Sequence, residues 1–211
     1  MTATVPAKLS PRGAARRRAF LAAATEVFLR KGYAEATLDE IIALSGGSRQ
    51  TLYAMFGGKQ GLFEAILAER CEAILAPLAA EAALAQPPEE ALVGLGVRLL
   101  GMLASGSAAL VRTVVAEAAR APEIARLFWR LGPGRNRELV ARYLAHQAAA
   151  GVLVLDSPEK AAARFIGIVL GLAHLRALLD LEPRPEPAEI EADVRAAVAH
   201  FLDGCRGPAA R

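Results

Sequence analysis

Apolar residues recur every three or four positions along most of the chain, which is the spacing of one face of an α-helix. The first such segment begins at Ser10-Pro11, a capping residue followed by a proline in the first turn. It ends at Lys31-Gly32, a cation that complements the helix dipole and a glycine that stops the helix. Its apolar stripe contains Phe20, Ala24, Val27 and Phe28.

Proline and glycine divide the rest of the chain into further helical segments. The segment that starts at Ser157 is apolar nearly all round from Phe165 to Leu175, so we expect it to be buried on more than one side. The whole pattern predicts an all-α fold. Apart from two short helices described next, the expected helices cover residues 59–75, 89–105 (ending at Gly106), 108–120, 122–131, 135–150, 157–181 and 188–202.

Residues 37–56 predict two short helices joined by a tight turn. Residues 37–40 (Thr-Leu-Asp-Glu) fit a capping box, in which Thr37 caps the helix and Glu40 reaches back to the cap. The sequence Ser45-Gly46-Gly47 suits a sharp turn because glycine tolerates positive φ angles. Ser48 is a good cap for a second helix, whose Leu52 and Phe56 would face inward. This is the pattern of a helix-turn-helix, which reads DNA with its second helix.

The outward side chains of the second helix suit DNA chemistry. Arg49 can donate two hydrogen bonds to guanine, and Gln50 can pair with adenine. Hydroxyl groups on this helix would contact phosphates. Thr37, at a helix N-terminus, is either a further phosphate contact or a cap alone. A lysine in a helix's first turn opposes the dipole, so Lys59 is expected to hold a phosphate together with backbone N–H groups. The candidate DNA contacts are Thr37, Ser48, Arg49, Gln50, Thr51, Tyr53 and Lys59.

The run from Gly32 to Phe63, GYAEATLDEIIALSGGSRQTLYAMFGGKQGLF, resembles the DNA-binding domain of TetR-family transcriptional regulators. Two positions depart from the usual pattern of that family. Gly47 stands where valine is frequent, which is expected to loosen packing at the turn. Met55 stands where a phosphate-contacting His or Tyr is frequent, so no such contact is expected of it. The run from Val111 to Leu144 also looks like the regulatory domain of the AefR-like subgroup.

Charge agrees with a nucleic-acid partner, although a solvated basic face would look the same. The chain has 211 residues and a net charge of +3, but residues 1–60 alone carry +5, which leaves −2 for the remainder. Such a basic end is typical of a DNA-binding protein. Arg16, Arg17 and Arg18 are candidates for contact with phosphate or a minor groove, or are a solvated cluster.

Several classes of protein are disfavoured. No apolar run reaches the roughly 18 residues of a membrane span, and the N-terminus lacks the apolar core of a secretory signal. The histidines (His146, His174, His200) and cysteines (Cys71, Cys205) stand in no metal-ligand spacing, and no phosphate loop or nucleophile elbow occurs. We therefore expect a cytoplasmic, nucleoid-associated protein that is not an enzyme and needs no metal or cofactor.

The expected domain organisation has four parts. Residues 1–12 form a flexible arm, residues 13–58 the helix-turn-helix domain, residues 59–203 a helical regulatory and dimerisation domain, and residues 204–211 a flexible tail. Residues 59–75 form the helix that connects the two domains.

The resemblance implies a homodimer joined by the last two helices. Independently, the 157–181 segment is too apolar for a monomer surface. Packing of its small residues within one chain is the competing interpretation. The candidate interface residues are Ala163, Gly167, Ile168, Gly171, Val194, Val198 and Phe201.

A pocket for a small-molecule effector is expected between the helices of the larger domain. Core filling explains each candidate lining residue equally well. The candidates are Leu99, Met102, Leu103, Phe128, Trp129, Phe165 and His174.

These expectations lead to a homodimeric repressor that binds a palindromic operator in double-stranded DNA and is released by an apolar or amphipathic ligand. The alternative is a DNA-binding protein or activator without a small-molecule sensor, in which the larger domain serves only dimerisation.

Overall fold

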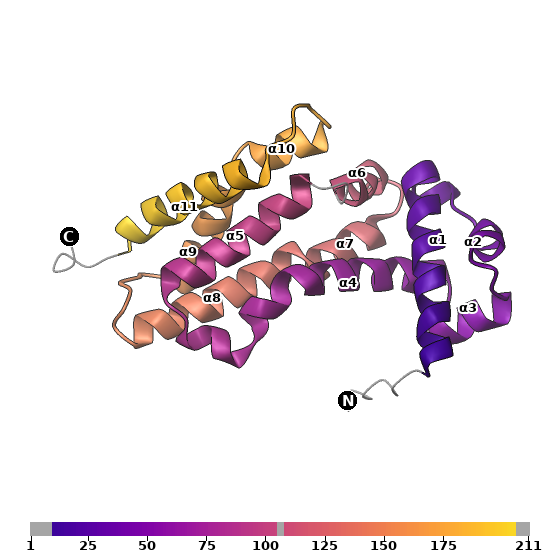
Figure 1. The fold of residues 1–211 in the computed structure, drawn as a ribbon, viewed down its shortest axis with the longest axis horizontal. Helices are drawn as coiled ribbons and strands as arrows, with labels where there is room; N and C mark the ends of the chain where they lie inside the picture. The colour runs from indigo at the N-terminus through magenta and orange to yellow at the C-terminus, as the bar shows by residue number, and fades with distance from the viewer. Residues whose placement is uncertain (1–9, 105–107, 206–211) are drawn as a thin grey trace.

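The computed structural model describes residues 10–104 and 108–205, and every regular element in these ranges is helical (Figure 1). The all-α prediction is therefore confirmed. The helices are α1 (Pro11–Glu35), α2 (Leu38–Ser45), α3 (Arg49–Phe56), α4 (Lys59–Ala79), η1 (Glu81–Ala85, a 3₁₀-helix), α5 (Pro88–Ala104), α6 (Ala108–Glu117), α7 (Pro122–Leu131), α8 (Pro133–Ala149), α9 (Pro158–Leu170), α10 (Ala173–Leu178) and α11 (Pro187–Asp203).

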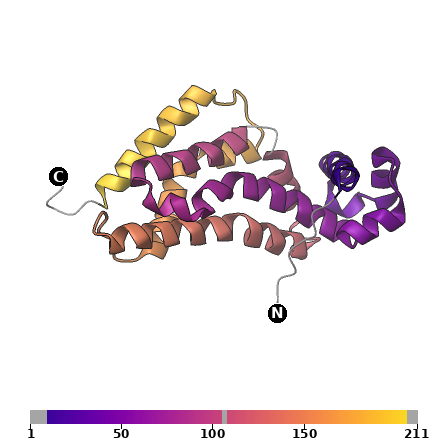
Figure 2. The ribbon, with the colours of Figure 1, turned by 60° about the horizontal axis from the view of Figure 1, so that its bottom comes forward.

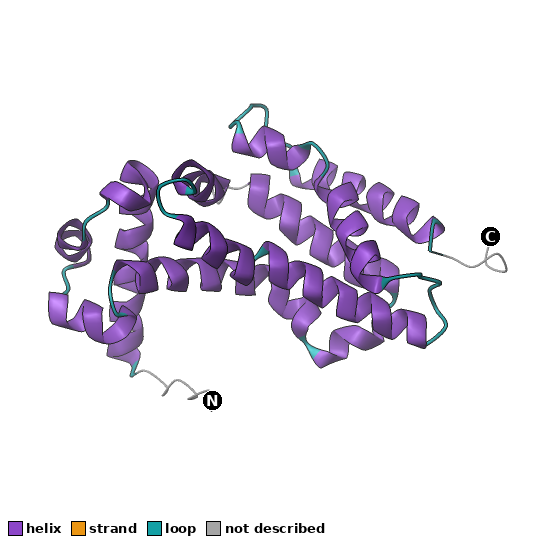
Figure 3. Cartoon of the chain, turned by 180° about the vertical axis from the view of Figure 1, so that it is seen from behind, coloured by secondary structure: helices purple, strands orange, loops and turns teal. Residues whose placement is uncertain are grey.

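The helices form a small unit and a larger bundle. Helices α1, α2 and α3 lie at one end of the molecule, and α4 runs from them into the larger bundle (Figure 1). A turn of the view shows α1 nearly end-on beside the start of α4, with the larger bundle extending to one side of it (Figure 2). From behind, short loops connect most of the helices (Figure 3).

Helix α1 starts where the sequence predicts and ends later. Ser10 caps it, because its hydroxyl oxygen accepts a hydrogen bond from the Gly13 backbone N–H at 3.2 Å. The helix kinks at Gly32, whose φ of +80° lies outside the helical region, and then continues to Glu35. Pro11 and Arg12 belong to this helix, so the expected arm of residues 1–12 is wrong at these two residues. The predictions for residues 1–9, Gly106 and residues 206–211 lie outside the described residues.

The hydrophobic core of the small unit extends beyond its own helices. The α1 stripe predicted from the sequence is fully buried and packs on Ile41, Leu52 and Phe63. The same core includes Leu110 and Val114 of α6, together with residues of α7. Residues far along the chain therefore complete the packing of the N-terminal helices.

A second core fills the larger bundle between α5, α8, α9 and α11. Tyr143 lies within it and donates a hydrogen bond to the Gln86 carbonyl at 2.7 Å. Burial raises the pKa of Tyr143 to about 12. Gln147 donates to the Leu84 carbonyl at 2.8 Å, so two buried side chains of α8 hold the η1 turn in place.

The helix predicted over residues 157–181 is wrong in the middle. Helix α9 ends at Leu170 because Gly171 takes a φ of +43°, and the short α10 follows. The expectation of burial on more than one side is also wrong within the single chain. Leu172 is 76% exposed, and Leu175 and Leu179 are exposed as well.

Two other features differ from or extend the sequence predictions. Helix α4 continues past the expected end at residue 75 and contains Pro77 in its last turn. No single helix of the described residues is long and apolar enough to cross a membrane; only the pair of α5 and α6, bent by 71°, meets that test jointly.

Candidate nucleic-acid interface

Helices α2 and α3 form the helix-turn-helix that the sequence predicts. The Thr37 hydroxyl accepts a hydrogen bond from the Glu40 N–H at 3.3 Å and so caps α2. The Glu40 carboxylate accepts hydrogen bonds from the Lys31 ammonium and the Thr37 hydroxyl, which lower the pKa of Glu40. Gly46 takes the left-handed conformation at the turn, with a φ of +65°. Ser48 caps α3 by accepting from the Thr51 N–H at 3.1 Å.

The turn is tightly packed, so the expectation that Gly47 loosens it is wrong. A Cβ atom on Gly47 would lie only 2.2 Å from Cζ of Phe20. The Phe20 ring also meets the Phe56 ring edge-on, with centroids 6.0 Å apart. Glycine at this position lets the aromatic side chain of α1 press directly against the backbone of the turn.

The candidate base-reading side chains lie on the exposed side of α3. Arg49 and Gln50, in its first turn, are exposed, and Tyr53 is 47% exposed. Thr51 is half-buried, and its hydroxyl lies 2.8 Å from the Ser48 hydroxyl. Arg49 pairs with Asp39 of α2 across the motif. The geometry can therefore present a guanidinium and an amide to the edges of base pairs.

Lys59 has a structural environment that the sequence did not reveal. Its ammonium donates to the carbonyls of Tyr33, Ala34 and Ala36 at 2.9, 3.0 and 3.1 Å. It also lies over the Tyr33 ring, 4.7 Å from the centroid. The three donors of the ammonium are thus used at the C-terminal end of α1. These hydrogen bonds explain a lysine at the N-terminus of α4 without a phosphate partner, and the predicted phosphate contact stays a prediction.

The arginine cluster of α1 divides into internal and exposed members. Arg16 donates to the carbonyls of Ser45 and Gly46 at 3.2 and 2.9 Å and so holds the end of α2. Arg17 pairs with Glu69 and lies over the Phe56 ring. Arg18 is exposed and, within the described residues, has no ion pair. Of the three, Arg18 remains the candidate for contact with DNA.

The larger bundle contains a cavity of about 330 Å³ between α5, α6, α10 and α11. Of the seven candidate lining residues, Leu103 lines this cavity and the other six do not. Leu99 and Phe165 are buried in the second core, and Met102 packs against that core. Phe128 packs against the core of the small unit, and Trp129 is 57% exposed. His174 is also exposed, with Nδ1 2.8 Å from the Gly171 carbonyl oxygen.

The polar side of this cavity was missed by the sequence reasoning. Arg112 of α6, Arg176 of α10 and Arg184 of the loop before α11 all line it, together with Asp180. These residues come from three separate segments, and no local pattern in the sequence brings them together. Their proximity follows from the packing of α6 against α10.

The candidate interface residues separate into an exposed and a buried group. Ala163, Gly167, Ile168 and Gly171 of α9 and its end are exposed. Val194, Val198 and Phe201 are 0%, 0% and 6% exposed, since they face α5 and α9 in the second core. These three are therefore wrong as interface residues: their side chains fill the core of their own chain.

Two family models match the sequence. The model described as "Bacterial regulatory proteins, tetR family" matches residues 20–66. The model described as "AefR-like transcriptional repressor, C-terminal domain" matches residues 90–204, more than half of the chain. No curated protein matches the chain.

Solved structures are similar over nearly the whole length. A putative TetR-family transcriptional regulator from Mesorhizobium loti is 26% identical, with a TM-score of 0.77 over 94% of this chain and 100% of that one. The flavonoid-responsive regulator FrrA is 30% identical, with a TM-score of 0.73 over 92% and 98%. The fatty acid degradation regulator FadR from Bacillus halodurans is 19% identical, with a TM-score of 0.69 over 94% and 98%, a likeness of fold alone.

Proposed function

The chain belongs to the TetR family of bacterial transcriptional regulators, with an AefR-like C-terminal domain, and we propose that it is a homodimeric repressor released from a palindromic operator by a small amphipathic ligand. The two solved relatives at 26% and 30% identity are both described as regulators. The observation that carries the proposal is the α2–α3 motif, with Arg49 and Gln50 exposed in the first turn of its second helix.

A dimer is supported by the apolar surface around the end of α9. Ile168, Leu172 and Leu175 are 41%, 76% and 46% exposed and lie close together in the sequence. Exposed leucines of this density mark an interaction surface. Gly167 and Ala163, one and two turns before Gly171, leave space for the backbone of a partner helix. A second copy of this surface would give an isologous interface and place two reading helices on one operator.

Ligand-dependent release is supported by the cavity and by a relative. FrrA is described as flavonoid-responsive, and a cavity of about 330 Å³ is within the range of small-molecule sites. Helix α6 contributes Arg112 to the cavity and Leu110 and Val114 to the core around α1. Ligand entry would shift the population between two positions of the N-terminal helices through α6.

The proposal is tested by fluorescence anisotropy with DNA fragments selected from the source genome, at several salt concentrations. We expect one palindromic site to bind at least about 10³-fold more tightly than random DNA. Salt-sensitive binding without a preferred fragment would instead indicate a non-specific binder. Absence of any binding would contradict the proposal.

Two alanine variants examine the reading helix. Arg49→Ala and Gln50→Ala are each expected to lower affinity for the selected operator by about 1–3 kcal/mol and to relax the preference at one base position. Thr51→Ala is the matched comparison, since a lost phosphate contact weakens all sequences alike. Variants of Arg49 and Gln50 that keep both affinity and site preference would contradict these roles.

A DNA-binding protein without a sensor is the alternative. In that case the larger bundle would serve dimerisation alone, and no small molecule would change operator affinity. Ligand-induced release from the operator excludes it.

A further inference from the structure

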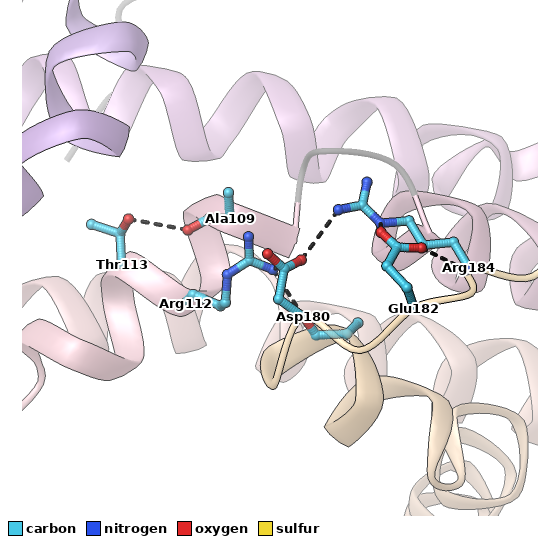
Figure 4. A network of polar contacts seen from close by, with 7 residues as sticks. Ala109, Arg112, Thr113, Asp180, Glu182 and Arg184 are labelled. Carbon is cyan, nitrogen blue, oxygen red and sulfur yellow. Dashed lines mark hydrogen bonds and ion pairs between the residues drawn. The ribbon is translucent and has the colours of Figure 1, made fainter.

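Three charged side chains meet at the α6–α10 side of the cavity (Figure 4). Arg112 Nη1 lies 3.1 Å from Asp180 Oδ1 and donates to the Ala177 carbonyl at 2.9 Å. Arg184 Nη2 lies 3.1 Å from the same Asp180 oxygen. One carboxylate oxygen is therefore shared by two guanidinium groups from different segments of the chain.

The cavity has an apolar side next to this cluster. Leu100 and Leu103 of α5, Leu181, and Ile190 of α11 line it. The side chain of Arg112 is 30% exposed and that of Asp180 is 54% exposed, so solvent and solutes reach the ion pair. The site thus combines an apolar surface with a pair of guanidinium groups that already bind a carboxylate.

Asp180 is a replaceable partner of the two arginines, because it lies in an exposed turn and not in the packed core. Its φ is +54°, its side chain is 54% exposed, and its ion pairs are therefore open to exchange with a dissolved carboxylate. Arg176 also lines the cavity and, within the described residues, has no ion pair. A carboxylate brought in by a ligand would meet the same two guanidinium groups and a third free one, while Asp180 would be freed.

Three other acidic groups lie at or beside the cavity: Glu189 and Asp193 line it, and Glu182 is next to it in the loop before α11. Glu182 is held by Arg184 at 3.2 Å, and Glu189 accepts a hydrogen bond from the Glu186 N–H at 2.9 Å. Asp193 of α11 lines the cavity and has no ion pair within the described part of the chain. An ammonium ligand directed to Asp193 is therefore the competing chemistry.

We infer that this cavity binds an amphipathic carboxylate, whose head group displaces Asp180 from Arg112 and Arg184 while its hydrocarbon part lies against Leu103 and Ile190. The inferred ligand class does not depend on the proposed function. Only the effect of the ligand on DNA binding rests on it. Arg112 lies on α6 between Leu110 and Val114, which are buried against the N-terminal helices. When a ligand replaces Asp180 as the partner of Arg112, the change therefore acts on α6, the helix that packs against α1.

Isothermal titration calorimetry without DNA tests the ligand class. The probes are octanoate, 1-octanol and octylamine, which share one chain length and differ in the head group. We expect octanoate to bind at least tenfold more tightly than octanol, with octylamine weakest. Equal binding of octanol would mean an apolar cavity without head-group recognition, and preference for octylamine would assign the site to Asp193; either result overturns the inference.

Two substitutions separate competition from a structural role. Asp180→Asn removes the competing charge, so we expect octanoate affinity to rise severalfold. Arg112→Gln is expected to lower it at least tenfold. Glu191→Gln is the matched control, because Glu191 pairs with Arg195 on the surface of α11 outside the cavity. Weaker octanoate binding by a folded Asp180→Asn protein would contradict displacement.

The final measurement is whether octanoate releases the protein from its operator, which we expect it to do. Failure of octanoate binding refutes the ligand class and leaves the operator experiment untouched. Failure of operator binding refutes the proposed regulator and leaves the calorimetric result standing.

Discussion

At the scale of single residues, three basic side chains near the N-terminal end of the chain have partners within the protein itself. The basic end of the chain is evident from the sequence, yet Arg16, Arg17 and Lys59 are held by carbonyls, a carboxylate and aromatic rings of the same unit. Those partners come from distant segments, so spacing along the chain does not reveal them. Gly47 is similar, because the Phe20 ring that requires glycine there lies on another helix.

Lys59→Gln distinguishes a structural lysine from a phosphate contact. Because the ammonium donates to three carbonyls, we expect its loss to destabilise the protein by about 1–3 kcal/mol in denaturant unfolding. The slope of log K against log salt for operator binding should not change, since no phosphate contact is lost. Arg18→Gln serves as the exposed comparison. If the magnitude of the slope instead fell by about 0.9 for each Lys59 replaced, Lys59 would be a phosphate contact.

At the scale of helices, the N-terminal caps were predicted well, but the packing partner of each apolar face was not. The caps Ser10, Thr37 and Ser48 and the turn at Gly46 are where the sequence indicates, because each depends on local backbone chemistry. The stripe of α11 was recognised, but a stripe does not say whether its partner belongs to the same chain or another. The break at Gly171 was missed because the apolar pattern continues through it.

Ile168→Glu examines the proposed dimer surface on α9. Ile168 is 41% exposed, so a charge there costs the single chain little, but it would be buried unpaired between two copies. Sedimentation velocity should show a monomer with an unchanged helical circular dichroism spectrum. Val115→Glu, at a 59% exposed valine on α6, is the control and should stay dimeric. A dimeric Ile168→Glu protein would place the interface elsewhere.

At the scale of the whole molecule, the division at residues 58 and 59 does not coincide with the division between the two cores. The fold class and the reading motif follow from local patterns and were predicted. The contribution of α6 to the N-terminal core was not, because nothing in its own stripe indicates which helices it covers. The cavity was missed for the same reason, since its charged residues gather only after α6 packs against α10.

Because α6 shares a core with the N-terminal helices, we expect a substitution in α6 to destabilise those helices. Leu110 is 4% exposed and packs in the core of α1 and α4, whereas Leu139 is 9% exposed and packs in the core of the larger bundle. Alanine at either position should cost about 2–5 kcal/mol. Hydrogen exchange should quicken in α1 and α4 for Leu110→Ala, and mainly in α5, α8 and α9 for Leu139→Ala. If exchange in α1 stayed at the wild-type rate in the Leu110 variant, the N-terminal helices would be an independent unit and α6 could not carry a signal to them.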